Sequence, residues 1–413
     1  MARPMADAPR IAIAGAGIAG LTAALALARA GNPVSLIEQS AVLEEVGAGI
    51  QLTPNASRVL IGLGLRDALA PLVVTPAGMD VRAGGSGAVL ASGPLGPEIE
   101  AAYGAPWWVV HRADLQAVLL QACRNEPAIS LETGLRLVSA TPLESGISLI
   151  LERSLSGTGE SPPSGSDAVS AQEKRLVSAL VGADGLWSAA RKALGDKNLP
   201  HNRSRTAWRA TVPVDTAPPG IPRDRVGLWL GAGAHLVHYP VKAGRLINLV
   251  AILSDPSSGE SWSGPGDKMV LVRRFRNWAE PARALIAAAD SFLTWPLGDR
   301  DTWFGPGEGA VTLMGDAAHP MLPFLAQGGA MAIEDAAVLA REVQATPGDL
   351  AAAFRRYEAA RRARVAAVQR GARVNGRIYH LDGPLGFARD TAIRLMGGKH
   401  LVSSYDWIYR HKA

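Results

Sequence analysis

The N-terminal part of the chain alternates short apolar runs with a helical segment. The apolar run Arg10–Ala14 predicts a fully buried parallel strand. Leu21–Ala30 is rich in Ala and Leu and predicts a helix that ends before Gly31, because glycine commonly follows a helix C-terminus. Pro33–Glu38 predicts a second strand. The order strand, glycine turn, helix, strand indicates one βαβ unit.

The rest of the pattern divides into antiparallel strands and helices. Residues Thr206–Ser254 alternate apolar and polar positions, as antiparallel strands do. Helical periodicity covers Asp267–Ala289, Gly328–Gln344 and Asp349–Gly371. Ala310–Met314 predicts a buried strand. The pattern favours an α/β fold, with a nucleotide-binding domain built from separated segments and a mostly antiparallel domain inserted in it.

The expected domain boundaries follow from these elements. We assign residues 1–75, 100–195 and 300–350 to the nucleotide-binding domain, residues 76–99 and 196–299 to the inserted domain, and residues 351–413 to a C-terminal helical segment. Arg153–Arg175 is rich in Ser, Gly and Pro and lacks aromatic residues. We expect a mobile loop between two strands there.

Composition narrows the class of protein. Hydrophobic residues make up 48% of the 413 residues, which is enough to bury a large core and excludes a disordered chain. The net charge is +5, but the densest basic cluster, Arg355–Arg364, is typical of a solvated helix face rather than a nucleic-acid site. The single cysteine, Cys123, excludes an internal disulfide and indicates a reducing compartment, so we expect a cytoplasmic protein.

The run from Ile11 to Ala28 carries no charge and resembles a membrane helix or a signal peptide. Two features argue against both. The run contains more Ala and Gly than Leu, which weakens its partitioning into a membrane. It also holds Gly15, Gly17 and Gly20 at the spacing of a phosphate-binding turn. We therefore expect no membrane association.

Each glycine of this turn has a physical task in dinucleotide binding. Gly15 permits the tight turn after the strand, Gly17 lets the backbone approach a pyrophosphate, and Gly20 lets the helix pack closely on the strand. The phosphates then lie at the helix N-terminus, where free amides and the helix dipole favour negative charge. Glu38, at the end of the second strand, can accept hydrogen bonds from ribose hydroxyls. This pattern does not separate FAD from NAD, and a glycine turn used only for packing is the alternative.

A second motif follows the Ala310–Met314 strand. Asp316 comes just after the strand end, where a carboxylate suits a sugar or ribityl hydroxyl. Amides at Gly328–Ala330 open the next helix and suit an anion. His319 has no second His, Cys or acid at ligand spacing, so we expect no metal.

These motifs resemble those of the single-component FAD-dependent aromatic hydroxylases, close to salicylate hydroxylase and 3-hydroxybenzoate 6-hydroxylase. The segments that carry the resemblance are residues 315–336, Gly182–Gly185 with Ser188 and Arg191, Glu45–Ala56, His111–Leu115, His238–Pro240 and Tyr405–Tyr409. The resemblance spans nearly the whole chain. It implies a p-hydroxybenzoate hydroxylase-like fold, in which a Rossmann-like FAD-binding domain carries an inserted substrate domain and C-terminal helices.

The resemblance also implies how FAD is held. The residues that it places at the cofactor are Gly15, Gly17, Ile18, Ala19, Gly20, Glu38, Gln39, Gln51, Arg112, Asp184, Asp316, Gly328, Gly329 and Ala330. Gln51, Arg112 and Asp316 would contact the ribityl–pyrophosphate part. The amides of Gly328–Ala330 would face flavin N1 and O2, where reduced flavin carries negative charge. For Asp184, a turn or helix-capping role is the alternative.

The substrate-side residues are His235 and Tyr239, which lie on one predicted strand. The period of two places both on the same face and His238 on the other. The resemblance places this face at the substrate, where a His/Tyr pair can remove or share a phenolic proton. The alternative is that both are ordinary sheet residues. Pro323 and Phe324 would line the pocket beside the flavin.

The function that the resemblance implies is aromatic hydroxylation. The resemblance implies that NADH or NADPH reduces bound FAD and that reduced flavin and O2 form a C4a-hydroperoxide. The distal oxygen of the hydroperoxide would attack a small aromatic acid of phenolic or hydroxypyridine type. One alternative is a flavoenzyme of the same fold that acts as a dehydrogenase or natural-product oxygenase. Another is a flavin-binding module without enzyme activity. Dimerisation is common in the family, which makes a homodimer a further expectation.

Overall fold

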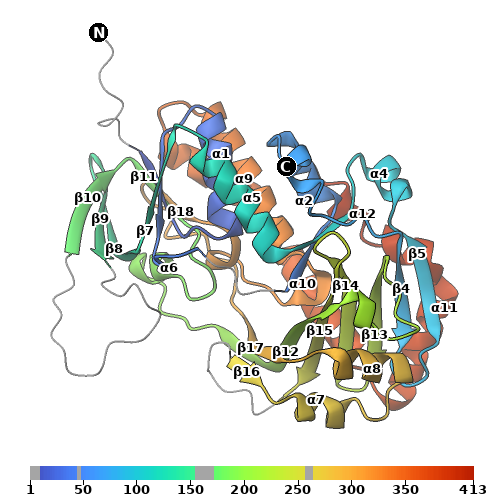
Figure 1. The fold of residues 1–413 in the computed structure, drawn as a ribbon. Coiled ribbons are helices and arrows are strands. Elements are labelled where there is room, and N and C mark those ends of the chain that lie inside the picture. Colours follow the sequence, from blue (N-terminus) through green and yellow to red (C-terminus); the bar gives the residue numbers. More distant parts are fainter. Residues whose placement is uncertain (1–9, 44–47, 154–171, 256–263) are drawn as a thin grey trace, which may run out of the picture.

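The computed structural model describes residues 10–43, 48–153, 172–255 and 264–413 (Figure 1). Residues 45–47 of the Glu45–Ala56 motif lie outside the described residues, and so does the centre of the expected loop, residues 154–171. The two ends of Arg153–Arg175 were wrongly assigned to a loop. Arg153 ends one strand, and Gln172–Val177 forms another that pairs with it antiparallel.

A five-stranded parallel sheet forms the centre of the first part of the fold. Its strand order is β18-β11-β1-β2-β7, and each neighbouring pair is parallel. The strands are β1 (Ile11–Ala14), β2 (Val34–Glu38), β7 (Ile129–Thr133), β11 (Ala179–Gly182) and β18 (Val311–Leu313). The apolar run predicted as a buried strand is therefore the middle strand, with β2 on one side and β11, from a distant part of the chain, on the other.

Helices and a small sheet cover this parallel sheet. In Figure 1, helices α1 (Ile18–Arg29), α5 (Arg112–Arg124) and α9 (Gly328–Ala345) lie side by side on one side of it. A three-stranded antiparallel sheet lies on the other side. It consists of β8 (Leu135–Leu143), β9 (Gly146–Arg153) and β10 (Gln172–Val177).

An eight-stranded sheet forms the second part of the fold, in the order β16-β17-β12-β15-β14-β13-β4-β5. Neighbouring strands of this sheet pair antiparallel, except for β13 and β4, which are parallel. The strands are β4 (Gly78–Ala83), β5 (Val89–Pro94), β12 (His201–Pro213), β13 (Arg225–Gly231), β14 (Ala234–Val241), β15 (Leu246–Ser254), β16 (Gly264–Gly266) and β17 (Phe292–Asp299).

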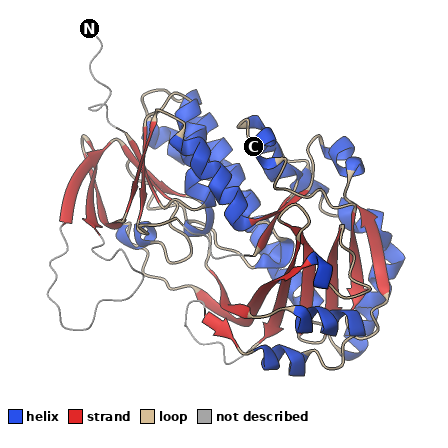
Figure 2. Cartoon of the chain, in the orientation of Figure 1, coloured by secondary structure: helices blue, strands red, loops and turns tan. Residues whose placement is uncertain are grey.

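Helices flank both sides of the large sheet (Figure 2). Two short helices, α7 (Lys268–Arg274) and α8 (Glu280–Ala288), pack on one face. The single helix predicted over Asp267–Ala289 is thus wrong. Pro281 lies in the first turn of α8 and has no amide hydrogen to donate to a preceding turn. A helix therefore cannot run unbroken through it from Asp267, and a new helix begins at Glu280.

The helices α10 (Leu350–Tyr379) and α11 (Gly383–Ser403) follow near the C-terminus. The predicted end of α10 at Gly371 is wrong, because α10 continues to Tyr379. Its glycines mark close contacts instead of a helix end. A Cβ at Gly371 would lie 3.0 Å from the Leu325 side chain, and one at Gly376 would lie 2.7 Å from the Phe324 ring.

The remaining elements join the two parts. The two-stranded antiparallel sheet of β3 (Gly49–Leu52) and β6 (Trp108–His111) lies between them. The other helices are α2 (Pro54–Gly62), α3 (Arg66–Leu69), α4 (Pro97–Tyr103), α6 (Ala189–Ala193) and α12 (Asp406–Tyr409). The uncharged run from Ile11 to Ala28 forms β1 and most of α1. Within the described ranges, no helix has both the length and the apolar character that crossing a membrane requires.

A buried ion cluster ties α10 to α9. The Arg361 guanidinium donates from Nη1 to Glu334 Oε2 at 2.7 Å and from Nε to Asp335 Oδ1 at 2.7 Å. All three side chains are buried. Burial alone would raise the pKa of Asp335, but His319, Arg361 and an amide hydrogen bond lower it to about 2. Both carboxylates therefore stay ionised at neutral pH, since the pKa of Glu334 is also lowered.

The same two carboxylates hold three chain segments in place. Asp335 Oδ2 accepts hydrogen bonds from the Gly315 amide at 2.9 Å and from His319 Nε2 at 2.6 Å. Glu334 Oε1 accepts one from Asn55 Nδ2 at 2.7 Å. The cluster thus fixes the loop after β18 and the start of α2 relative to the start of α9.

We expect Arg361→Met to lower the unfolding free energy at pH 7 by about 3–5 kcal/mol, because it leaves Asp335 buried without its guanidinium partner and Glu334 with Arg364 alone. Carboxylates whose pKa is lowered by folding stabilise the protein above about pH 4 and lose that effect as the pH falls towards 2. In the variant their pKa values rise, so its deficit relative to wild type should shrink on acidification. Urea unfolding at several pH values measures this difference.

Arg370→Met is the matched control, because Arg370 lies on the exposed side of the same helix. It should change the unfolding free energy by less than about 0.5 kcal/mol. A deficit for Arg361→Met that is as large at pH 4 as at pH 7 would contradict the assignment of the cluster as an ionised network.

Candidate active site

The glycine turn between β1 and α1 is too tightly packed for side chains at two of its positions. Gly15 has φ +102°, and a Cβ on it would lie 2.6 Å from the Ala183 carbonyl oxygen. A Cβ on Gly20 would lie 1.8 Å from the Gly15 carbonyl oxygen. At Gly17, by contrast, a Cβ would meet no atom within 4 Å. Gly15 and Gly20 therefore allow the helix to pack closely on the sheet, and Gly17 leaves open space at the helix N-terminus.

Glu38, at the end of β2, lies beside this turn. Its Oε2 accepts a hydrogen bond from the Ala16 amide at 2.8 Å, and its Oε1 accepts one from the Ser40 amide at 2.8 Å. Each oxygen keeps a second lone pair for a ligand hydroxyl. Gln39, the next residue, is exposed. The carboxylate thus fastens the turn and remains able to accept a further hydrogen bond.

Asp316, from a distant part of the chain, lies close to this turn. Its neighbour Gly315 packs between Ala19 of α1 and Ala332 of α9, since a Cβ there would lie 3.0 and 3.3 Å from their Cβ atoms. The Asp316 side chain is exposed, yet enough protein surrounds it that desolvation raises its pKa, against the charge of Arg112. That combination describes a carboxylate in the wall of a recess.

The N-terminus of α9 lies next to Asp316. A Cβ on Gly328 would lie 4.0 Å from Asp316 Oδ1. The first-turn amides of Gly328, Gly329 and Ala330 have no partner within their own helix, as at every helix start. A Cβ on Gly329 would lie 2.6 Å from Ile50 Cδ1 of β3, so the Ile50 side chain packs against the start of α9.

Two helix N-termini, an exposed carboxylate and the Arg112 cation therefore border one region. Open space at Gly17 suits a pyrophosphate, because backbone amides can approach it without a side chain between them. Ile18, Ala19 and Gly20 supply the free amides of the α1 first turn. The donor set fits a dinucleotide such as FAD.

Two of the expected cofactor residues have other contacts. Gln51 is buried in β3, opposite Val109 of β6. The Asp184 carboxylate accepts hydrogen bonds from the Ala190 amide at 2.9 Å and from the Ser188 hydroxyl. Ser188 is also the N-cap of α6. The Asp184 side chain thus orders the start of α6, which was the alternative reading, while its backbone packs against Gly15.

His235 and Tyr239 lie on the same face of β14, as their spacing predicts. His235 is buried, with its ring 5.3 Å from the Phe324 ring and 5.4 Å from the Tyr379 ring, measured between centroids. Tyr239 packs against Gly49 of β3. His238 faces the opposite way, 6.3 Å from the Trp229 ring.

Burial controls the protonation of this pair. It lowers the pKa of His235 well below its usual value, helped by His380 and Arg205. It raises the pKa of Tyr239. At neutral pH the imidazole is therefore neutral, with one ring nitrogen that can accept a hydrogen bond, and the phenol of Tyr239 stays protonated and able to donate one.

Phe324 and Pro323 belong to a short 3-10 helix, Pro323–Leu325, at the same place. Phe324 is buried, and the Arg205 guanidinium lies 5.0 Å from its ring centroid. Pro323 is half-buried. Phe324 is packed against its neighbours, so it forms a wall rather than an open surface.

The sequence reasoning missed three residues here: the buried Asn248 and the partly buried Tyr379 and His380. Asn248 Oδ1 accepts a hydrogen bond from the Gly49 amide at 2.7 Å and so joins β15 to β3. Tyr379 and His380 end α10 and contact His235. The sequence did contain an indication of Asn248, because it is a polar residue inside an apolar strand. The other two had none, because they follow the predicted end of their helix.

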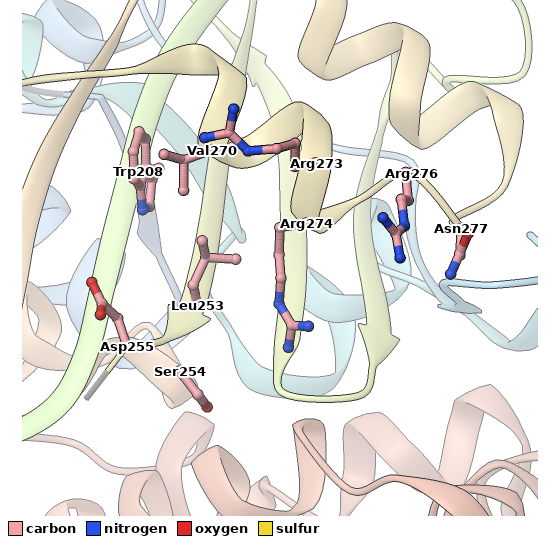
Figure 3. Close-up of a pocket in the computed structure, with 9 residues that line it drawn as sticks. All are labelled: Trp208, Leu253, Ser254, Asp255, Val270, Arg273, Arg274, Arg276 and Asn277. Atoms are coloured by element: carbon pink, nitrogen blue, oxygen red, sulfur yellow. The ribbon is translucent and has the colours of Figure 1, made fainter. Parts of the chain in front are cut away.

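A separate surface pocket lies between the end of β15 and α7 (Figure 3). It is lined by Trp208, Leu253, Ser254, Asp255, Val270, Arg273, Arg274, Arg276 and Asn277. None of the expected cofactor residues belongs to it. It is therefore not the region that the two helix N-termini border.

Known proteins with related sequences match nearly the whole chain. The FAD binding domain family matches residues 9–372. A 3-amino-4-hydroxybenzoate 2-monooxygenase of Streptomyces platensis is 37% identical over 408 residues, which cover 98% of this chain and 96% of that protein. The 3-hydroxybenzoate 6-hydroxylase 1 of Aquipseudomonas alcaligenes is 34% identical over 400 residues, which cover 96% of each chain.

The fold matches as well. A variant of HpxO from Klebsiella pneumoniae, solved in complex with FAD, superposes with a TM-score of 0.81 at 27% identity. The superposition covers 97% of this chain and 98% of that one. Sequence, fold and the arrangement of glycines and carboxylates agree. The chain belongs to the family of FAD-dependent aromatic hydroxylases, which are flavoprotein monooxygenases.

Proposed function

We propose that this monooxygenase hydroxylates a small phenolic or hydroxypyridine-type acid, with O2 and NADH or NADPH as co-substrates. The observation that carries the proposal is the buried, neutral His235 beside Phe324, on the sheet face that also holds Tyr239. The names of its relatives, which act on 3-amino-4-hydroxybenzoate and 3-hydroxybenzoate, support the substrate class. A cytoplasmic location would supply the nicotinamide.

The proposed cofactor site combines the groups around the glycine turn. The amides of Ile18, Ala19 and Gly20 would bind the pyrophosphate, and Glu38 would bind the adenosine ribose. Arg112, Gln51 and Asp316 would contact the ribityl–pyrophosphate part, and the α9 amides would face the flavin ring. Bound FAD would carry the reducing equivalents of NADH or NADPH and supply the oxygen activation that hydroxylation needs.

The chain itself would activate the substrate. A phenol with an ordinary pKa near 10 is mostly protonated at neutral pH and is a weaker nucleophile than its phenolate. His235 would take this proton, and Tyr239 would donate a hydrogen bond to the oxygen that remains. Arg205 lies close enough to influence His235 electrostatically, and its positive charge favours the phenolate form. The buried surroundings would keep water from the reacting atoms.

The activity test is a substrate panel on purified, FAD-loaded protein. We expect 3-amino-4-hydroxybenzoate, 3-hydroxybenzoate or 6-hydroxynicotinate to stimulate NADH or NADPH oxidation and to yield a hydroxylated product in matching amount, measured by mass spectrometry. Oxidation that yields only hydrogen peroxide with every acid would refute the proposal. Turnover that does not depend on an aromatic acid would favour a dehydrogenase.

The cofactor site has its own test in Gly17→Ala. The added methyl group meets no protein atom, so the thermal unfolding temperature of the FAD-free protein should not change. It would occupy the space proposed for the pyrophosphate, so the FAD dissociation constant should rise about tenfold or more, a loss of about 1.4 kcal/mol. Gly62→Ala in α2, where a Cβ also meets nothing, is the control. Equal FAD affinity in both variants would contradict the proposed position of the pyrophosphate at Gly17.

The substrate-side pair is tested by His235→Gln and Tyr239→Phe. Each should reduce product formation at least about tenfold while FAD content holds, because general acid–base groups contribute at least that much. His238→Gln is the matched control, since His238 is a buried histidine on the opposite face of the same strand. Full coupled turnover in both test variants would exclude the proposed role.

A further inference from the structure

A chain of hydrogen bonds leads from His235 to the protein surface. His235 Nδ1 lies 2.8 Å from His380 Nε2, and His380 Nδ1 lies 3.1 Å from Ser254 Oγ. His235 is buried, His380 is partly exposed and Ser254 is exposed. Ser254 lines the pocket of Figure 3, on the side that faces the C-terminal helices. Three side chains from β14, the end of α10 and the end of β15 thus bridge the interior and the solvent.

Backbone hydrogen bonds hold these three side chains in position. Gly233, in the turn between β13 and β14, donates its amide to the His380 carbonyl oxygen at 3.1 Å. The Gly233 carbonyl oxygen accepts a hydrogen bond from the Ser254 amide at 2.9 Å. Arg389 of α11 donates from Nη1 to the Tyr379 carbonyl oxygen at 2.9 Å. One turn residue therefore places both outer members, and α11 secures the helix end that carries His380.

The charges around the chain keep both imidazoles neutral. Burial, together with the guanidinium groups of Arg205, Arg274 and Arg389, lowers the pKa of His380 to about 3. A neutral imidazole has one nitrogen that donates and one that accepts. With His235 Nδ1 donating to His380 Nε2, and His380 Nδ1 donating to Ser254 Oγ, every link has a proton and a lone pair in the right place. Because the arginines disfavour an imidazolium, a proton would pass through the chain without residing on it.

We propose that His235, His380 and Ser254 form a path that releases the phenolic proton of the substrate to the solvent. The proposal rests on the function proposed above. The substrate O–H bond breaks as His235 Nε2 takes its proton, and the Nδ1 proton of His235 moves to His380 Nε2. The Nδ1 proton of His380 moves to Ser254 Oγ, and the serine hydroxyl proton passes to water. One phenolate and one proton in solvent result, and no electrons are transferred.

His380 and Ser254 act only through His235, so their test must separate proton release from folding. FAD-loaded full-length protein is mixed with 3-hydroxybenzoate, or with whichever panel acid is turned over, in weak buffer with a pH indicator. Stopped-flow absorbance then gives the rate of proton release on binding. We expect His380→Ala to slow this rate about tenfold or more, and Ser254→Ala to slow it in the same direction. FAD content and the dissociation constant of the acid should stay within about threefold of wild type, less than 1 kcal/mol.

Two further measurements decide between a relay and a structural role. Added imidazole should restore the rate in His380→Ala, because it can replace the missing side chain as a proton carrier. His400→Ala, an exposed histidine of α11, should leave the rate unchanged. If His380→Ala loses FAD, Ser254→Ala decides alone, because its side chain is exposed.

Wild-type proton release in both His380→Ala and Ser254→Ala would overturn the path, and so would a slow rate that imidazole does not restore. Failure of the proposed function is distinguishable from these results. It would appear in the wild-type enzyme as a lack of hydroxylated product with any panel acid. A failed relay would instead leave wild-type hydroxylation and the effect of His235→Gln intact.

Discussion

The buried contact of Arg361 with Glu334 and Asp335 is the constraint on which the arrangement of this site depends. A buried charge is tolerated only when its partners are complete, so Arg361 requires both acids and Asp335 requires Arg361, while Arg364 adds a second guanidinium at Glu334. Through the same carboxylates, the cluster fixes the Gly315 amide and Asn55. The proposed ligand groups on the loop after β18 and on α9 are consequently held by interactions that do not involve a ligand.

Much of the fold could be predicted from the sequence, because its signals are local. An apolar strand, three glycines and a terminal acid lie within a short stretch, and the steric requirement of Gly15 and Gly20 is visible in the contacts that a Cβ would make. The period of two placed His235 and Tyr239 on one face correctly. The helix ends were harder, because Gly371 and Gly376 occur where α10 touches neighbouring side chains, and glycine alone does not distinguish that from a helix end.

The parts that could not be predicted are contacts between distant segments. His235 and His380 are 145 residues apart, and Asn55 and Glu334 are 279 apart. A buried ion pair and a hydrogen-bonded histidine pair leave no periodic signal, since each residue fits an ordinary helix or strand position. Arg361 illustrates this well. By sequence it belongs to a basic cluster typical of a solvated helix face, yet the fold buries this one arginine against two acids.

A short loop connects the two sides of the site. At one end of the loop, Phe324 contacts the His235 ring. At the other end, Gln327 donates from Nε2 to the Thr53 hydroxyl at 2.9 Å and is the N-cap residue of α9. Between them, Ala326 has φ +53°, which costs an alanine about 1–2 kcal/mol. Such a conformation persists when both flanks are fixed. The aromatic contacts hold one flank and the polar contacts the other, so the substrate-side imidazole and the α9 amides keep their spacing through this loop.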